Sequence, residues 1–136
     1  MIFYVFTDSC AWALFVIRLL VGITFALHGS QKVFGLFDGP GLTGFAHYVT
    51  TLGLPAILGY CAALIEFFAG MALALGIMPR IAALLLIPLM FVAIWKVHLR
   101  HGFFGYNGGF EYPLNLIILL FVLIIAGPGR LALFAF

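Results

Sequence analysis

Charged residues are scarce in this chain of 136 residues. Lysine and arginine together number six and aspartate and glutamate four, so that charged residues make up 7% of the sequence and hydrophobic residues 66%. A soluble domain carries about 25% charged residues. Ten ionic side chains cannot cover a water-facing surface, and the mean hydropathy of +1.30 agrees. The composition excludes a water-soluble monomer and a disordered chain, and it predicts an integral membrane protein.

Basic clusters and a cysteine framework are also missing. The net charge is +2 and no run of Lys or Arg forms a phosphate-binding face, so nucleic acid is not an expected partner. Cys10 and Cys61 belong to helices that enter the membrane from opposite sides, which separates them by about 20 Å in depth. A disulfide needs Cα atoms within about 7 Å. We therefore expect two free thiols, and the sequence has no CxxC motif.

The long hydrophobic runs define the expected architecture. A spanning helix needs about 20 apolar residues, and breaks at Gly and Pro predict spans at 11–28, 55–78, 81–98 and 112–127. Only a tight turn at Pro79 and Arg80 separates the second span from the third, so these two form an antiparallel hairpin. The predicted fold is all-α, a single membrane domain over residues 1–136. It is a bundle of four transmembrane helices with both termini on the same side.

Two shorter segments lie outside the predicted spans. The first connection is long and rich in glycine, and Phe45, Tyr48, Val49 and Leu52 follow helical spacing within it. This pattern predicts a short interfacial or re-entrant helix at 42–52. The apolar tail, Leu131 to Phe136, is expected at the membrane interface.

Two ionisable residues interrupt the apolar spans. An ionisable side chain at the bilayer centre costs about 2.5–3.5 kcal/mol on insertion scales, so such groups persist when they pair or have a function. Arg18 in the first span and Glu66 in the second predict an ion pair, either direct or bridged by a polar ligand. Small residues at helical spacing surround both and allow close helix contact: Ala11, Gly22 and Gly29 in one span, and Gly59, Ala63, Gly70 and Ala74 in the other. The alternative is a pair that only sets helix register.

A second polar cluster is predicted at one end of the bundle. His28 and Lys32 lie at the end of the first span, His98 at the end of the third and Glu111 at the start of the fourth. A histidine beside a carboxylate can exchange protons near neutral pH, so these residues predict a functional pocket. The alternative is anchoring at the membrane interface by long or amphipathic side chains.

Metal and haem sites have weaker support. His28 and His98 end on the same side and could in principle hold a haem, but no spacing requires one. His98 and His101 lie three residues apart and lack a third ligand at a diagnostic spacing. No metal site is predicted, and haem is disfavoured without being excluded.

Several motifs resemble the DoxX/DoxD family of small four-helix membrane proteins. The resemblance covers about Ala13 to Arg130. The residues that carry it are Arg18, the run His28-Gly29-Ser30-Gln31-Lys32-Val33-Phe34-Gly35, Glu66 with Gly70, Gly76 with Pro79-Arg80, His98 with Gly102-Phe103-Phe104, Glu111, and the closing Gly127-Pro128-Gly129-Arg130.

The resemblance implies a multi-pass protein of the plasma membrane of a bacterium or archaeon. Members of the family are linked to quinone-coupled thiosulfate oxidation, to terminal oxidases and to thiol or oxidant stress, and distant relatives act as assembly factors or cargo receptors. The missing CxxC argues against direct dithiol exchange by this chain.

The leading hypothesis is a quinone-interacting subunit of a membrane oxidoreductase system for sulfur, thiol or respiratory redox chemistry. A partner redox subunit would accompany it in the lipid bilayer, and a homo-oligomer is conceivable. The candidate catalytic residues are His28, His98 and Glu111. The candidate quinone-binding residues are Arg18, Lys32, Glu66, Trp95 and Asn115. The alternatives are a non-enzymatic assembly or scaffold subunit, and a small-molecule or metal carrier that works as an oligomer.

Overall fold

A computed structural model of the chain describes residues 2–134, with side chains from residue 8 onward. The elements are α1 (Ile2–Phe34), α2 (Gly41–Thr51), α3 (Ala56–Leu75), α4 (Pro79–Ala93), a π-helical turn η1 (Ile94–His98), two 3₁₀ turns (Leu99–His101 and Gly105–Asn107) and α5 (Glu111–Ala126). The all-α prediction is confirmed over this part of the chain. α1 continues well past residue 28, the expected end of the first span, and α2 occupies the place of the short helix expected at 42–52.

Within residues 2–134, three helical segments are long and apolar enough to cross a membrane. They are Asp8–Phe34 with 27 residues, Ala56–Leu75 with 20 and Pro79–His101 with 23. The fourth predicted span is shorter than a typical spanning helix, because α5 has 16 residues. At about 1.5 Å per residue it covers roughly 24 Å, less than the ~30 Å of a hydrocarbon core. The structure is a membrane-type helical bundle in which three helices have full spanning length.

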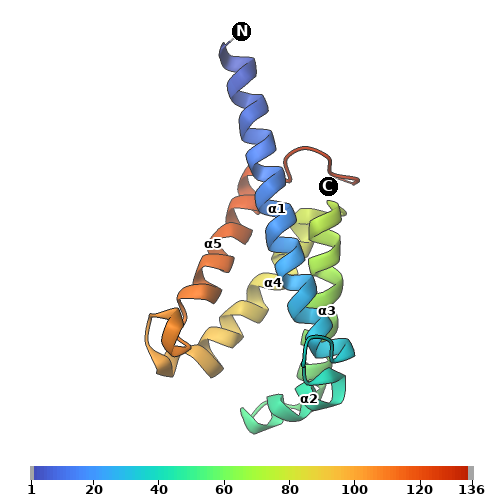
Figure 1. Cartoon of the computed structure of the whole chain (residues 1–136), viewed down its shortest axis with the longest axis vertical. Helices are drawn as coiled ribbons and strands as arrows, with labels where there is room; N and C mark the ends of the chain where they lie inside the picture. The colour runs from blue at the N-terminus through green and yellow to red at the C-terminus, as the bar shows by residue number, and fades with distance from the viewer. Residues whose placement is uncertain (1, 135–136) are drawn as a thin grey trace.

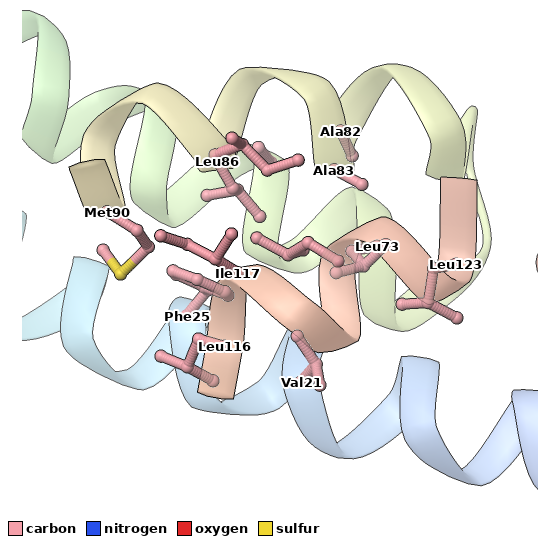
Figure 2. Packing of buried hydrophobic residues seen from close by; sticks show 13 residues of the cluster. Val21, Phe25, Leu73, Ala82, Ala83, Leu86, Met90, Leu116, Ile117 and Leu123 are labelled. Atoms are coloured by element: carbon pink, nitrogen blue, oxygen red, sulfur yellow. The ribbon is translucent and has the colours of Figure 1, made fainter. Parts of the chain in front are cut away.

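The helices lie side by side around a common apolar centre. In Figure 1, α1 is the longest helix and packs along α3, while α4 and α5 close the other side and α2 lies at the lower end. The first turns of α1 project above the other helices, and the segment after α5 lies at that same upper end. Apolar residues from α1, α3, α4 and α5 meet in the core, and Figure 2 labels ten of them. Phe25, Leu73, Leu86 and Leu120 are almost completely buried there.

Glycine allows the close approach of α1 and α3. A Cβ at Gly22 would overlap the backbone of Ala74, and one at Gly29 would overlap that of Phe67. A Cβ at Gly70 would overlap the backbone of Phe25 and Ala26. The predicted small-residue contact between the first two spans is confirmed, and it sets an antiparallel register between them.

Gly29→Ala is expected to lower the free energy of unfolding by about 1–3 kcal/mol, the usual cost of overpacking a close contact. The added methyl group meets the backbone of Phe67, which cannot move aside without separating the two helices. Thermal unfolding of the purified protein in detergent measures the effect. The matched control is Gly44→Ala, where only the side chain of Pro40 is near and α2 gains a better helix former. An unchanged midpoint for Gly29→Ala would contradict the close contact.

The upper end of the bundle is closed by the C-terminal segment. α3 ends at Leu75 and is capped by Gly76, which has a φ of +73°. The predicted tight turn is present at residues 76–78, because Pro79 and Arg80 already form the first turn of α4. Phe134 N–H donates to the Gly76 carbonyl at 3.0 Å, and Met78 N–H donates to the Phe134 carbonyl at 2.8 Å. The tail therefore packs along the α3–α4 turn. Its last two residues, 135 and 136, lie outside the described residues.

Candidate functional site

A cavity of about 480 Å³ lies between α2, α3, α4 and η1. Ligand pockets in proteins commonly measure about 300–1,000 Å³ and combine apolar walls with a few polar groups. Most of the lining residues are apolar, and those with polar atoms in their side chains are Lys32, Tyr48, Cys61, Trp95, Lys96 and His98. The cavity therefore has the size and lining of a site for an amphipathic small molecule.

Lys32 reaches the cavity from the last turn of α1. Its Nζ forms an ion pair with Oε2 of Glu66 and lies 4.8 Å from the centre of the Phe45 ring. The Glu66 side chain is 4% exposed and the Lys32 side chain 24%. An ammonium group has three N–H donors. The ion pair with Glu66 thus leaves further donors for a ligand in the cavity, while the carboxylate balances the charge.

The predicted pair between Arg18 and Glu66 is wrong. Because α1 and α3 are antiparallel, Gly22 faces Ala74 and Gly29 faces Phe67. This register places Glu66 beside the last turns of α1, where Lys32 lies, and Arg18 beside the end of α3. The sequence prediction treated Lys32 as part of a loop, because the first span was expected to end before it.

Arg18 stabilises the opposite end of the bundle and does not line the cavity. Its side chain is completely buried. Nη1 donates to the Leu73 carbonyl at 3.5 Å, and Nη2 donates to the carbonyls of Arg130 at 3.1 Å and Leu131 at 3.2 Å. The last carbonyls of a helix lack helical partners and favour a cation. Arg18 therefore caps α3 and holds the C-terminal segment, and it lies away from the cavity although it was a candidate quinone-binding residue.

His98 lines the cavity from the end of η1. Its Nδ1 lies 2.7 Å from the carbonyl oxygen of Gly108. A carbonyl only accepts, so this contact assigns the proton to Nδ1 and leaves Nε2 as the acceptor in the neutral ring. Proton exchange by His98 stays a prediction, and the contact with Gly108 identifies Nε2 as the nitrogen that would take part.

The other predicted site residues lie near this end of the bundle and have different neighbours. Trp95 lines the cavity, with Nζ of Lys96 over its ring at 4.1 Å. Oε2 of Glu111 accepts a hydrogen bond from Gly105 N–H at 2.9 Å, which holds the loop before α5. His28 packs on the Tyr112 ring with centroids 6.3 Å apart. Asn115 is exposed on α5. Their catalytic and binding roles stay predictions.

α2 contributes a wall that the sequence analysis did not assign to the site. Phe45, Tyr48 and Val49 line the cavity from this helix, and Leu52 lines it from the position directly after the helix. Their helical spacing predicted an amphipathic segment, and that pattern was the available signal. It identified the apolar face of α2 but not the helices that this face covers.

The cysteines and potential metal ligands are dispersed. Cys10 and Cys61 are both free, as predicted, and Cys61 lies on the cavity wall. Among the described residues, no three His, Cys, Asp or Glu side chains come together in a way that could hold a metal ion. The metal-carrier alternative therefore draws no support from this part of the chain.

Comparison with known proteins identifies related chains. The sequence matches the DoxX family over residues 13–99. It is 32% identical over 100 residues to "Putative oxidoreductase CatD" of Bacillus subtilis (strain 168), an alignment covering 74% of this chain and 69% of the relative. It is 31% identical over 129 residues to "Uncharacterized membrane protein Rv3486" of Mycobacterium tuberculosis (strain ATCC 25618 / H37Rv), covering 86% and 76% respectively. No solved structure matches the chain. The matches and the three apolar helices identify a multi-pass membrane protein.

Proposed function

Since the chain belongs to the DoxX family, we propose that it is a quinone-interacting subunit of a membrane oxidoreductase system. The observation that carries the proposal is the cavity, which places the Lys32 ammonium and the His98 ring in an otherwise mostly apolar and aromatic enclosure. A quinone has the complementary chemistry, with two carbonyl oxygens on an apolar ring. The oxidoreductase name of the Bacillus subtilis relative supports the same class of reaction.

The proposed chemistry follows from the polar groups around the cavity. Lys32 donates a hydrogen bond to one carbonyl oxygen of the quinone, and His98 exchanges a proton with the other oxygen through Nε2. Reduction to the quinol takes two electrons and two protons. A partner redox subunit supplies the electrons, and water at this end of the bundle supplies the protons, one of them through His98. Phe45, Tyr48 and Trp95 provide ring faces for the head group.

The membrane setting of this proposal is the plasma membrane of a bacterium or archaeon. Both relatives come from bacteria. We place α5 as a fourth, shorter span and both termini on one side of the membrane. The start of α1 and the segment after α5 lie at the same upper end in Figure 1, which supports this placement of the termini. The wide exposure of apolar side chains around the bundle, such as Leu20, Phe68 and Ile125, suits contact with lipid, with a partner subunit or with further copies of the chain.

A short-chain quinone is expected to quench the fluorescence of Trp95 saturably. The chain has two tryptophans, and Trp95 lines the cavity whereas Trp12 lies on α1. A Trp12→Phe variant in detergent therefore reports the cavity alone. In that background, His98→Gln is expected to weaken binding by roughly fivefold to tenfold, the equivalent of about one lost hydrogen bond.

His101→Gln is the matched control. His101 is exposed, its Nδ1 bonds to the Val97 carbonyl at 2.9 Å, and it does not line the cavity. The quinone affinity of this variant should equal that of its parent. Quenching that rises linearly with quinone concentration, or a His98→Gln variant that binds as tightly as its parent, would refute the proposed site.

A further inference from the structure

A second hollow lies on the surface formed by α3 and α4. This α3–α4 groove measures about 370 Å³. It is lined from Leu64 to Ala72 on α3 and from Ile77 to Leu85 on the α3–α4 turn and α4. Every residue that lines it is apolar. Ile65 lines both the groove and the cavity. The two hollows therefore adjoin each other.

The spacing along each helix shows that the cavity and the groove share one face. On α3, Leu58 lines the cavity, Ile65 lines both, and Ala72 lines the groove, each seven residues from the next. On the α4 side, Ile81 lines the groove, whereas Pro88 and Trp95 line the cavity at the same spacing. Residues seven apart lie on one face of a helix. The path from Leu58 to Ala72 is about 21 Å long at 1.5 Å per residue.

Polarity changes sharply along this path. The charged and hydrogen-bonding groups, Lys32 and His98 among them, lie at the cavity end. At the other end, the groove reaches the α3–α4 turn at Ile77 and Met78 without a polar side chain. A molecule with a polar head and a long hydrocarbon tail has this same distribution of polarity.

We propose that the cavity and the groove form one continuous site for a long-chain prenylquinone, with the ring in the cavity and the tail along the α3–α4 groove. This inference rests on the proposed quinone-binding function and adds the substrate class. Lipid tails are as apolar as the groove, so moving the quinone tail from lipid into the groove gains little hydrophobic free energy. The selectivity for a long tail comes from packing contacts, and the anchored ring keeps the tail in place.

The test compares two neighbouring leucines of α4. Leu85 lines the groove, whereas Leu84 does not line either hollow, and both are exposed, at 47% and 56%. Leu85→Trp places a larger side chain against the groove and is expected to weaken the binding of a long-chain prenylquinone by about threefold to tenfold, the equivalent of several lost van der Waals contacts. Leu84→Trp should leave this affinity unchanged. Neither variant should alter the affinity for a short-chain quinone analogue. This affinity is measured by quenching of Trp95 in the Trp12→Phe background, and the fluorescence of the added tryptophan is subtracted.

A photoreactive prenylquinone keeps the inference testable if Leu85→Trp does not fold. The experiment uses the protein without substitutions in the groove. A diazirine at the end of the tail should label segments 64–72 and 77–85, and peptide mass spectrometry identifies the labelled segments. Labelling spread over all lipid-facing helices, or equal long-chain affinity in the two leucine variants, would overturn the continuous site while leaving ring binding in the cavity intact. Loss of short-chain binding in the parent protein would instead contradict the proposed function itself.

Discussion

Lys32→Met is expected to lower the free energy of unfolding by about 3 kcal/mol, because it leaves the carboxylate of Glu66 buried without its cation. Glu66 is 3% exposed, so water cannot replace the ammonium group. Glu66→Gln should cost less. The Lys32 side chain that remains is 24% exposed, and its ammonium can turn toward the cavity opening. Lys32→Met should therefore lower the free energy of unfolding more than Glu66→Gln does. Two partners of a surface ion pair would not show this difference.

The double variant Lys32→Met/Glu66→Leu should recover much of the stability, since a buried ion pair can be replaced by apolar groups at little cost. It should not recover quinone binding, because the donor to the carbonyl oxygen is missing. Lys96→Met is the control for losing a lysine from the same cavity without breaking an ion pair, and it should change stability by less than about 1 kcal/mol. Thermal or denaturant unfolding in detergent measures all four variants. Equal effects of Lys32→Met and Lys96→Met would show that the ion pair does not stabilise the fold.

Arg18→Met is expected to destabilise the protein by about 2–3 kcal/mol, since three backbone carbonyls lose hydrogen bonds from a charged group. The loss should release the C-terminal segment from the end of α3. Gly76→Ala should have a similar effect for a steric reason. A Cβ at this position would collide with Nη1 of Arg18, and the φ of +73° is unfavourable for alanine.

Unfolding midpoints, together with the rate of tryptic cleavage after Arg130, measure the attachment of the C-terminal segment. Arg80→Met serves as the control, because Arg80 is an exposed arginine near the same end of the bundle. Folded Arg18→Met should retain its affinity for a short-chain quinone, since Arg18 does not line the cavity. A selective loss of quinone binding with normal stability would return Arg18 to the role that the sequence alone suggested.

Local pattern predicted much of this fold. The scarcity of charge and the long apolar runs predicted a membrane helical bundle, and Pro79 with Arg80 predicted a tight turn between α3 and α4, which lies just before them at residues 76–78. Small residues at helical spacing predicted which faces of α1 and α3 meet. Each of these features depends on residues close together in the chain, where helical geometry relates sequence spacing directly to position.

The composition of the site was harder to predict, because its residues come from five separate elements, α1, α2, α3, α4 and η1. Lys32 of α1, Phe45 of α2, Cys61 of α3 and His98 of η1 reach one cavity only through the packing of those elements. The sequence identified Lys32 and His98 as site candidates from their polarity at a membrane boundary. It offered no reason to select Cys61, and it identified Phe45 only as part of a helix.

The sequence by itself determined that this protein lies in a membrane, that its helices expose apolar faces to lipid and that two charged groups are buried between them. Only the tertiary structure decided which charges pair. Helical periodicity determines the face on which Arg18, Lys32 and Glu66 lie, but it leaves open how far one helix slides along another. The close glycine contacts of α1 with α3 set that offset. They place Glu66 against Lys32 beside the cavity, and Arg18 at the opposite end, where it caps a helix.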